Sequence, residues 1–423
     1  MNIIVITRSS WSNNNSIGNT MTNFFKGFPL NCKFYNIYYR TDTPINDICV
    51  NSLSISELSI IKSFFNKSEA GKIVYPNSGG LKESSVALEK NIYRHSSATS
   101  GYLLKFLREI IWLTPNWKKH TKEYVESVSP DVIFMPVFGC YYPHRVLKYI
   151  KSISNAKVVI FHADDNYTMR QFSLNPLFWL YRVGLRRWVK RTVDIADTQY
   201  GISEIQCEEY KGCFNKNCKL ITKGYNFNIK MPVNDSNNTE MTFVYTGNVN
   251  VGRWRSLAIL GEALDWACSK GYKAHLDIYS GTVLTKSMKK AFDKHHSIIF
   301  HGSVSAKRVK LLQSNADVLV YVESMNLKNR LEVHQSFSTK IVDYMYSGNC
   351  ILAIGTSDEA SIAHMIKHKC AQVITNQNET KEKVLKLIKN SDLRKSLALS
   401  AWNTGKEYHN ITKIQMELLH SFK

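Results

Sequence analysis

A glycine-containing loop followed by arginines is the first segment whose residue types suit phosphate binding. Residues 243–255 read FVYTGNVNVGRWR, so a strand-like run ends at Gly247 and two arginines arrive before the next helical stretch. Gly247 lets the backbone approach a ligand closely, Asn248 follows it, and Arg253 can donate two hydrogen bonds to phosphate oxygens. The loop is neither a G-x-G-x-x-G fingerprint nor a P-loop, since no Gly-Lys-Ser/Thr follows. Taken alone, it is equally well explained as a surface turn before a basic helix.

A short predicted helix further along the chain offers a second set of phosphate-binding groups. Residues 334–355 read HQSFSTKIVDYMYSGNCILAIG, with Ser338 and Thr339 at the start of a helix of about nine residues. Its unpaired N–H groups and its dipole favour a diphosphate, and Lys340 adds a full positive charge. Asp343, one turn later, could accept hydrogen bonds from both ribose hydroxyls of a nucleotide. The alternative is that Asp343 only complements the helix dipole and that Lys340 is solvated.

A histidine and two aspartates follow a predicted strand in the first half of the chain. The segment 161–166 reads FHADDN, so His162, Asp164 and Asp165 should lie at the carboxyl end of that strand, where parallel sheets bind their ligands. Any of the three could orient a substrate hydroxyl or take its proton. The competing interpretation is that the aspartates cap the next helix. No Asp-x-Asp sequence occurs in the chain, and we expect no metal site.

Alternating strands and helices are predicted to position these residues. Such alternation indicates parallel sheets covered on both faces. In the first half, the apolar runs that predict strands lie at 3–7, 33–37, 131–136, 157–162 and 195–202. Periodicity is lost between 226 and 242, and the alternation then resumes. The expected fold class is α/β, with two doubly wound Rossmann-like domains facing across a cleft. We assign 1–228 to the N-terminal domain, 229–405 to the C-terminal domain and 406–423 to a helix packing back toward the first.

Composition and charge limit the partners. The chain has 423 residues, 44% of them hydrophobic and 12% aromatic, which suits two folded domains. A formal net charge of +21 requires an acidic partner, and nucleic acid, anionic lipid and phosphorylated substrates all satisfy it. We do not expect nucleic acid, because no RNA-recognition, zinc-finger or helix-turn-helix pattern occurs. Nine cysteines without a C-x-x-C pair, no signal peptide and no apolar run of about 18 residues predict a cytoplasmic protein.

Two basic amphipathic stretches leave membrane binding open. In 102–119, Leu103, Phe106, Leu107 and Ile110 recur at helical spacing. The second stretch, 177–191, interleaves apolar residues with Arg182, Arg186, Arg187, Lys190 and Arg191. The default explanation is that the apolar positions face the core and the basic faces are solvated. The alternative is docking on an anionic surface, with the protein peripheral on the inner face of the cytoplasmic membrane.

The order of these motifs resembles the donor half of GT-B glycosyltransferases, especially the large retaining family four of bacterial surface polysaccharide type. In that family a glycine ends the first strand of the second domain, and a basic residue six positions later meets the donor phosphates, as Gly247 and Arg253 would. The segment 298–324, IIFHGSVSAKRVKLLQSNADVLVYVES, matches the family's next conserved run. Asp343 takes the place of the ribose-binding carboxylate. The family's other glutamate is Gln335 here, and Asn248 replaces an arginine.

The resemblance implies a hexosyltransferase without a cofactor. It would move a sugar from a nucleotide diphosphate-sugar to a growing capsule or O-antigen type glycan, free or lipid-linked, by a metal-independent and retaining reaction. The C-terminal domain would bind the donor and the N-terminal domain the acceptor. Donor-binding residues would be Gly247, Asn248, Arg253, Ser338, Thr339, Lys340 and Asp343. His162, Asp164 and Asp165 would be catalytic, and Ser10, Trp11 and Gly18, after the first strand, would approach the acceptor. The alternatives are a nucleotide-sugar epimerase of the same fold and, less favoured, a basic nucleic-acid-binding protein.

Overall fold

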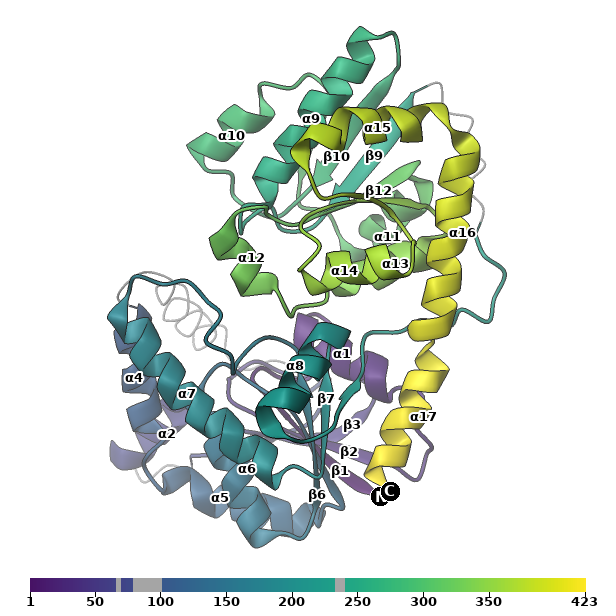
Figure 1. Ribbon diagram of the computed structural model, residues 1–423. Coiled ribbons are helices and arrows are strands. Elements are labelled where there is room, and N and C mark those ends of the chain that lie inside the picture. The colour runs from purple at the N-terminus through teal and green to yellow at the C-terminus, as the bar shows by residue number, and fades with distance from the viewer. Residues whose placement is uncertain (66–69, 79–100, 233–239) are drawn as a thin grey trace. The chain divides into compact units, whose positions relative to one another are not determined.

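The computed structural model describes residues 1–65, 70–78, 101–232 and 240–423, and the chain divides into two compact units (Figure 1). The first unit comprises Met1–Ile221 and Thr412–Lys423, and the second comprises Thr222–Ile411. The predicted boundaries after residues 228 and 405 lie a few residues from these divisions. The difference arises because Tyr225 pairs with Asn410 in an isolated parallel bridge, which draws both connecting segments into the second unit.

The first unit is built on an eight-stranded sheet with continuously apolar central strands. The strand order is β4-β3-β2-β1-β5-β6-β7-β8, and every neighbouring pair is parallel except β3 and β4. All residues from Ile3 to Ile6 are fully buried, as expected for a strand covered on both faces. The strands are β1 (Asn2–Thr7), β2 (Lys33–Tyr38), β3 (Cys49–Ser54), β4 (Lys72–Val74), β5 (Val132–Pro136), β6 (Lys157–His162), β7 (Thr198–Gly201) and β8 (Cys218–Leu220).

Helices pack on both faces of this sheet. An aromatic cluster joins α1 and α17 to one face, where the ring of Phe24 lies 6.4 Å from that of Phe134 and 5.4 Å from that of Phe161. The other face packs against α5, α6 and α7 through a core that includes Trp117 and Leu147. The helices are α1 (Ser16–Phe25), α2 (Glu57–Phe65), α4 (Gly101–Ile111), α5 (Asn116–Val128), α6 (Tyr141–Ile153), α7 (Pro176–Ile195), α8 (Glu204–Phe214) and α17 (Ile411–Phe422).

The C-terminal end of the chain belongs to the first unit. The ring of Phe422 on α17 lies 6.0 Å from that of Phe25 and 5.6 Å from that of Phe28. Gln415 Nε2 donates a hydrogen bond of 3.0 Å to the carbonyl of Asn23. The helix predicted over 406–423 therefore begins later, at Ile411, because α16 of the second unit continues to Tyr408.

The second unit repeats the scheme with a six-stranded, fully parallel sheet in the order β11-β10-β9-β12-β13-β14. Its strands are β9 (Met241–Thr246), β10 (Ala274–Tyr279), β11 (Ile298–Gly302), β12 (Val318–Val322), β13 (Cys350–Ile354) and β14 (Gln372–Ile374). Its α-helices are α9 (Arg253–Ser269), α10 (Lys286–Phe292), α11 (Ala306–Asn315), α12 (Leu327–Val333), α13 (Thr339–Ser347), α14 (Ala360–Lys367), α15 (Thr380–Lys389) and α16 (Ser391–Tyr408).

Each sheet contains one point where the strand order reverses. In the first unit the chain proceeds outward from β1 to β2 and β3, then starts again on the other side at β5. In the second unit the same reversal occurs between β9 and β12. At such a switch point the connections leave the two strands in opposite directions, which opens a place for a ligand at their carboxyl ends. Two ligand positions follow from topology, one in each unit.

The amphipathic stretches differ from the default expectation. Residues 102–119 form parts of two helices, and on α4 the side chains of Leu103, Leu107 and Ile110 are 58%, 49% and 57% exposed, so the expectation that they face the core is wrong. On α7, Tyr181 and Leu185 are buried, as predicted. Within the part of the chain that the structure describes, no helix has the length and apolar character needed to cross a membrane.

Candidate functional site

The switch point of the second unit brings together the two predicted phosphate-binding segments. β9 ends at Thr246, and Gly247 follows it with a φ of +136° that suits glycine. A Cβ atom at this position would lie 2.7 Å from Lys340 Nζ, so a side chain here would displace the lysine. The loop of the first motif is therefore in direct contact with the helix of the second, although Gly247 and Lys340 are 93 positions apart in the chain.

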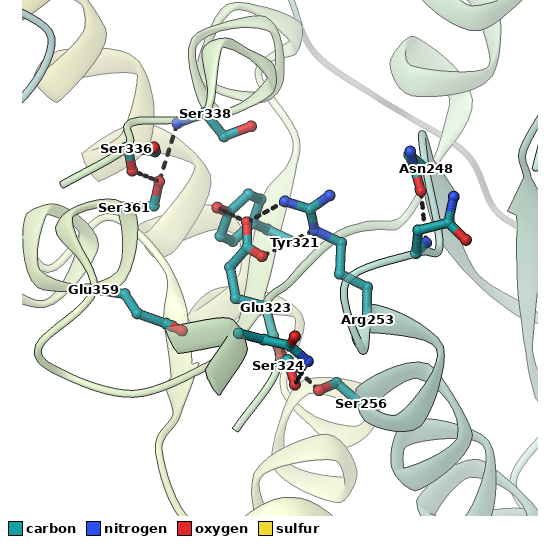
Figure 2. A network of polar contacts seen from close by, with 12 residues as sticks. Asn248, Arg253, Ser256, Tyr321, Glu323, Ser324, Ser336, Ser338, Glu359 and Ser361 are labelled. Atoms are coloured by element: carbon teal, nitrogen blue, oxygen red, sulfur yellow. Dashed lines mark hydrogen bonds and ion pairs between the residues drawn. The ribbon is translucent and has the colours of Figure 1, made fainter. Parts of the chain in front are cut away.

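The loop after Gly247 is fixed by a hydrogen bond within it and by hydrogen bonds with Tyr245 and Thr282. Asn248 Oδ1 accepts hydrogen bonds from the Asn250 N–H at 2.5 Å and from Thr282 Oγ1 at 3.4 Å. Tyr245 Oη donates to the Asn248 carbonyl at 2.6 Å. The Asn248 amide oxygen, seen at the right of Figure 2, thus shapes the loop. The amide nitrogen is the part of this side chain left to meet a ligand.

Arg253 is bound to a buried carboxylate that the sequence analysis did not identify. Its Nε and Nη2 each donate to Glu323 at 2.9 Å, and Tyr321 Oη donates to the same carboxylate at 2.7 Å (Figure 2). Burial, which lowers the pKa of Arg253, is outweighed by Glu323, and the pKa is raised. Arg253 therefore reaches a phosphate only through the edge of the guanidinium that Glu323 leaves accessible, or by giving up this pair.

The amino end of α13 is supported from α14. Ser338 is the N-cap residue, and its side chain makes no capping hydrogen bond. Its N–H donates instead to Ser361 Oγ at 3.0 Å, as the upper part of Figure 2 shows. Thr339 is the first helical residue, directly before Lys340. The Ser338 hydroxyl and the first N–H groups of the helix are therefore available to donate hydrogen bonds to an anion.

The Lys340 ammonium lies near two tyrosine rings and is repelled by the charge of Arg253. Its ammonium lies 4.7 Å from the centre of the Tyr245 ring and 5.8 Å from that of Tyr321. Burial and the charge of Arg253 lower the pKa of Lys340 to about 8, although Glu323 and Asp343 act in the opposite direction. An anion bound at this position would relieve the repulsion between Lys340 and Arg253.

Asp343 has two protein partners that share one carboxylate oxygen. Lys223 Nζ forms an ion pair with Oδ1, and Tyr225 Oη donates to the same oxygen at 2.6 Å. The Tyr225 ring stacks on Tyr346 with centroids 4.3 Å apart. The predicted acceptance of two ribose hydroxyls would therefore have to use Oδ2, or compete with Lys223 and Tyr225.

A second buried carboxyl group near Glu323 also escaped the sequence analysis. Glu359, only 1% exposed, accepts from the Thr356 N–H at 3.0 Å through Oε2, while its buried Oε1 has no hydrogen-bond partner among the described residues. Burial and the charge of Glu323 raise the pKa of Glu359 to about 8. Glu323 could have been inferred from its place directly after the buried strand β12, whereas nothing local marks Glu359.

The three predicted catalytic residues of the first unit have different surroundings. His162 is fully buried, 3.3 Å from Gln199 Oε1 through Nε2, and burial lowers its pKa to about 3. Asp165 pairs with Arg182 at 3.0 Å and accepts from the N–H groups of Tyr167 and Thr168, at 2.9 and 2.8 Å. Asp164 is exposed. These contacts hold Asp165 in the folded framework, whereas the buried Nδ1 of His162 has no hydrogen-bond partner among the described residues, and the catalytic role of both residues stays a prediction.

The predicted acceptor-binding residues of the loop after β1 are also engaged internally. Ser10 Oγ donates to Asp42 Oδ2 at 2.7 Å. Trp11 is fully buried, and its Nε1 donates to Thr22 Oγ1 at 3.0 Å. A Cβ atom on Gly18 would lie 2.0 Å from the Ser12 carbonyl oxygen, so this glycine lets α1 pack against the loop.

Within the described ranges, no three histidine, cysteine, aspartate or glutamate side chains gather in a metal-binding arrangement. This concerns the protein's own ligands.

Known proteins are similar to this chain in fold. No family model matches the chain, and no curated protein matches it by sequence. Among solved structures, sucrose-phosphate synthase from Thermosynechococcus elongatus has a TM-score of 0.63 and 11% identity, over 99% of this chain and 97% of that chain. HepE from Anabaena, in complex with UDP and glucose, has a TM-score of 0.62 and 11% identity, over 100% and 99%.

A third structure is similar over part of the chain. TarM from S. aureus, in complex with Fondaparinux, alpha-GlcNAc-glycerol and UDP, has a TM-score of 0.53 and 14% identity, over 73% of this chain and 59% of that chain. At such identities the likeness concerns fold. Together with the two doubly wound parallel sheets, it shows that this protein has the predicted α/β architecture and the GT-B fold of these glycosyltransferase structures.

Proposed function

We propose that this protein is a glycosyltransferase that moves a sugar from a nucleotide diphosphate-sugar to a growing bacterial surface glycan of capsule or O-antigen type. The observation that carries the proposal is the contact of Gly247 with Lys340 at the amino end of α13, directly at the β9/β12 switch point. A helix N-terminus, a lysine and a glycine that admits close approach are the groups that bind a diphosphate.

The donor would be held by groups of the second unit alone. Its diphosphate would lie on the first N–H groups of α13 beside Lys340, and the ribose would lie toward Asp343 Oδ2. Uridine diphosphate is the first nucleotide to test, because the HepE and TarM structures contain UDP. Lys340 and the helix dipole would stabilise the charge that develops on the departing diphosphate, which supplies electrostatic catalysis without a metal.

The finer parts of the proposal concern the reaction and the acceptor. We expect retention at the anomeric carbon, no organic cofactor, and a glycan acceptor that is free or carried on a membrane lipid. The basic and apolar residues exposed on α4 and α7 support a location at the inner face of the cytoplasmic membrane.

The test begins with donor binding. UDP, ADP and GDP are titrated into the full chain while the unfolding temperature is followed, and a ligand at 100 times its Kd should stabilise by about 2.7 kcal/mol. UDP-glucose is then incubated with the protein, and proton NMR identifies the first anomer of glucose released by slow hydrolysis. Release of α-glucose fits a retaining transferase. Release of the β anomer contradicts retention, and conversion of the intact nucleotide sugar to its epimer favours the epimerase instead.

Donor turnover should survive chelation of divalent metals. Hydrolysis or transfer measured in excess EDTA is expected to match that in its absence, because Lys340 and the α13 dipole carry the charge of the leaving group. Addition of manganese after EDTA is the control. Complete loss of turnover that manganese restores would overturn the metal-independent reaction.

A further inference from the structure

Two cysteine thiols lie together at the carboxyl end of strand β7. Cys207 is on α8 and Cys218 begins strand β8, and both are free thiols in the structure. Gly201, the last residue of β7, shows how close they come, because a Cβ atom added to it would lie 2.8 Å from Cys207 Sγ and 3.3 Å from Cys218 Sγ. Two sulfur atoms that approach one point this closely are themselves neighbours.

Hydrogen bonds connect the same two residues. The Cys207 thiol donates to the carbonyl of Lys219, the residue after Cys218, with a sulfur–oxygen distance of 3.4 Å. The Cys218 thiol donates in turn to Cys207 Sγ, and this hydrogen bond lowers the pKa of Cys207. The chain is therefore folded so that the two sulfurs face each other, and Cys207 is the thiol that gives up its proton first.

The pair lies near the surface of the first unit. Cys207 is 9% and Cys218 is 8% exposed, and β8 is the outermost strand of its sheet. β8 has only three residues, and a short strand at the edge of a sheet opens locally more easily than a central strand does. A small reagent can therefore reach these thiols without unfolding of the whole unit.

A third cysteine nearby is placed differently. Cys213 is also on α8 and is closer to Cys218 in sequence than Cys207 is, but its side chain is exposed. On a helix of about 3.6 residues per turn, positions 207 and 213 point in different directions. Proximity in sequence would favour Cys213 as the partner of Cys218, whereas the fold favours Cys207.

We propose that Cys207 and Cys218, the edge dithiol, are a modification site at which a low-molecular-weight disulfide is reduced and a reversible Cys207–Cys218 disulfide is formed. The Cys207 thiolate attacks one sulfur of the reagent and releases the other half of the reagent as a thiolate. Cys218 then loses its proton, attacks the Cys207 sulfur and releases the second half. The two released halves take up the protons that the two cysteines lose.

The new bond ties down a helix that contacts two of the predicted catalytic residues. Tyr210 on α8 donates to Asp165 Oδ1 at 3.2 Å, and its ring lies 4.7 Å from that of His162. A crosslink between α8 and β8 restricts the unfolded chain and so stabilises the folded one. Oxidation should therefore raise the urea midpoint of unfolding. The edge dithiol does not depend on the proposed transfer reaction.

Tryptic peptides distinguish the three cysteines, because trypsin cleaves between them, after Lys211 and Lys216. The folded full chain is incubated with hydroxyethyl disulfide, the remaining thiols are alkylated in urea, and the unreduced digest is analysed by mass spectrometry. The peptides that contain Cys207 and Cys218 should be linked, and dithiothreitol should separate them. Absence of this linkage, or an equal amount of Cys213 linked to Cys218, would overturn the proposal.

The same reaction in urea shows whether the fold selects the pair. In the unfolded chain Cys213 should compete for Cys218, because it is the nearer thiol in sequence. The Cys213–Cys218 linkage should therefore appear in urea and be absent from the folded protein. If the two linkages occur in the same proportions in both states, the fold does not select the pair and the proposal is wrong.

Serine variants test the effect on stability, since a hydroxyl keeps the approximate size of the thiol and its ability to donate. Treatment with hydroxyethyl disulfide should raise the urea midpoint of the parent protein and of Cys213→Ser, which is the matched control. It should not raise the midpoint of Cys207→Ser or Cys218→Ser. Equal shifts in all four proteins would assign the stabilisation to other thiols and contradict the edge dithiol.

Discussion

Lys340 sits where small changes in protonation change the charge of the proposed donor site. Burial and Arg253 lower its pKa to about 8, so its ammonium begins to deprotonate within the range used for assays. Glu323 forms an ion pair with Arg253 and so neutralises much of its positive charge. The positive charge offered to a diphosphate therefore depends on Lys340 more than on the arginine that the sequence pattern emphasised.

UDP affinity should accordingly fall as the pH rises. A bound diphosphate favours the protonated ammonium, so the site must take up a proton when free Lys340 is neutral. With a pKa of about 8, the protonated fraction drops about tenfold between pH 7 and pH 9, and Kd should rise by the same factor. Isothermal titration at several pH values measures this. Lys340→Gln should bind more weakly at pH 7 and lose the pH dependence, and an unchanged dependence would contradict the assignment.

Asp343 is the other residue whose substitution is informative. Asp343→Asn should weaken UDP binding on the order of tenfold or more while the unfolding midpoint changes little, because a charge-assisted hydrogen bond to the ribose is lost. The same change also breaks the ion pair with Lys223. Lys223→Met is the control, since it removes the pair and keeps the carboxylate. If Lys223→Met weakens binding as much as Asp343→Asn, the aspartate acts by positioning the site and does not hold the ribose.

The helix α13 shows how element ends determine the site. It runs for nine residues from Thr339 to Ser347, between the N-cap Ser338 and Gly348, whose φ is +76°. A Cβ atom on Gly348 would lie 2.5 Å from the Pro232 carbonyl oxygen. Only glycine therefore ends the helix at this point without strain, and β13 begins two residues later.

Alanine at this helix end should destabilise the second unit. Gly348→Ala is expected to cost about 1 kcal/mol or more, because the left-handed backbone and the close carbonyl both oppose a side chain. Gly212→Ala on α8 is the matched control, since nothing lies within 4 Å of the added Cβ atom, and it should stabilise by roughly 0.5–1 kcal/mol. Urea denaturation measures both. Similar effects of the two changes would argue against a strained helix end.

Buried neutral histidines make the whole molecule sensitive to acid. Burial lowers the pKa of His144 to about 4, of His162 and His409 to about 3, and of His364 to about 2. His409 and His364 approach each other to 3.4 Å, which also disfavours a charge on either. In the unfolded chain these side chains take up protons near pH 6.5.

Stability should therefore fall as the pH drops below 6.5. The unfolded chain binds protons that the folded chain cannot, and each such histidine costs about 1.4 kcal/mol per pH unit until its folded pKa is reached. Urea denaturation at pH 7, 6 and 5 tests the slope. His162→Phe should reduce the slope by about one proton, whereas His296→Gln, at an exposed position, should not. A slope unaffected by His162→Phe would contradict a neutral buried histidine.

Membrane docking would depend on exposed basic residues of α7. Arg187, Lys190 and Arg191 are exposed on α7, but Arg182 is 5% exposed and donates to the Thr168 carbonyl, so it belongs to the framework. Neutralising the three exposed residues should release the protein from anionic vesicles, since each contributes about 1 kcal/mol near the surface.

A second basic helix provides the comparison for this prediction. Lys286, Lys289 and Lys290 are exposed on α10, and neutralising them should leave vesicle sedimentation unchanged. High salt should release the parent protein, because the Debye length shrinks from about 10 Å at 0.1 M to about 3 Å at 1 M. Equal sedimentation of the two triple variants would make the α7 face an ordinary solvated surface.

Local sequence patterns predicted the structural features that depend on residues close together in the chain. Buried strands were recognised from continuous apolar runs and α13 from its N-cap and glycine, while the donor position at Gly247 and Lys340 stays a prediction. These features follow from backbone sterics and short-range hydrogen bonds, which act within a few residues. The α/β class and the two doubly wound sheets were therefore predictable.

Only the tertiary structure decided which charges are paired. Glu323 pairs with Arg253, which is 70 positions away in the chain, and Lys223 pairs with Asp343, which is 120 positions away. The tertiary structure also decided burial, since His162 and Asp165 are buried while Leu103 and Leu107 are exposed. The sequence leaves these outcomes open because they depend on strand order and on how helices cross the sheet. Whether a side chain meets a partner, a core or water is settled by residues that are distant in the chain.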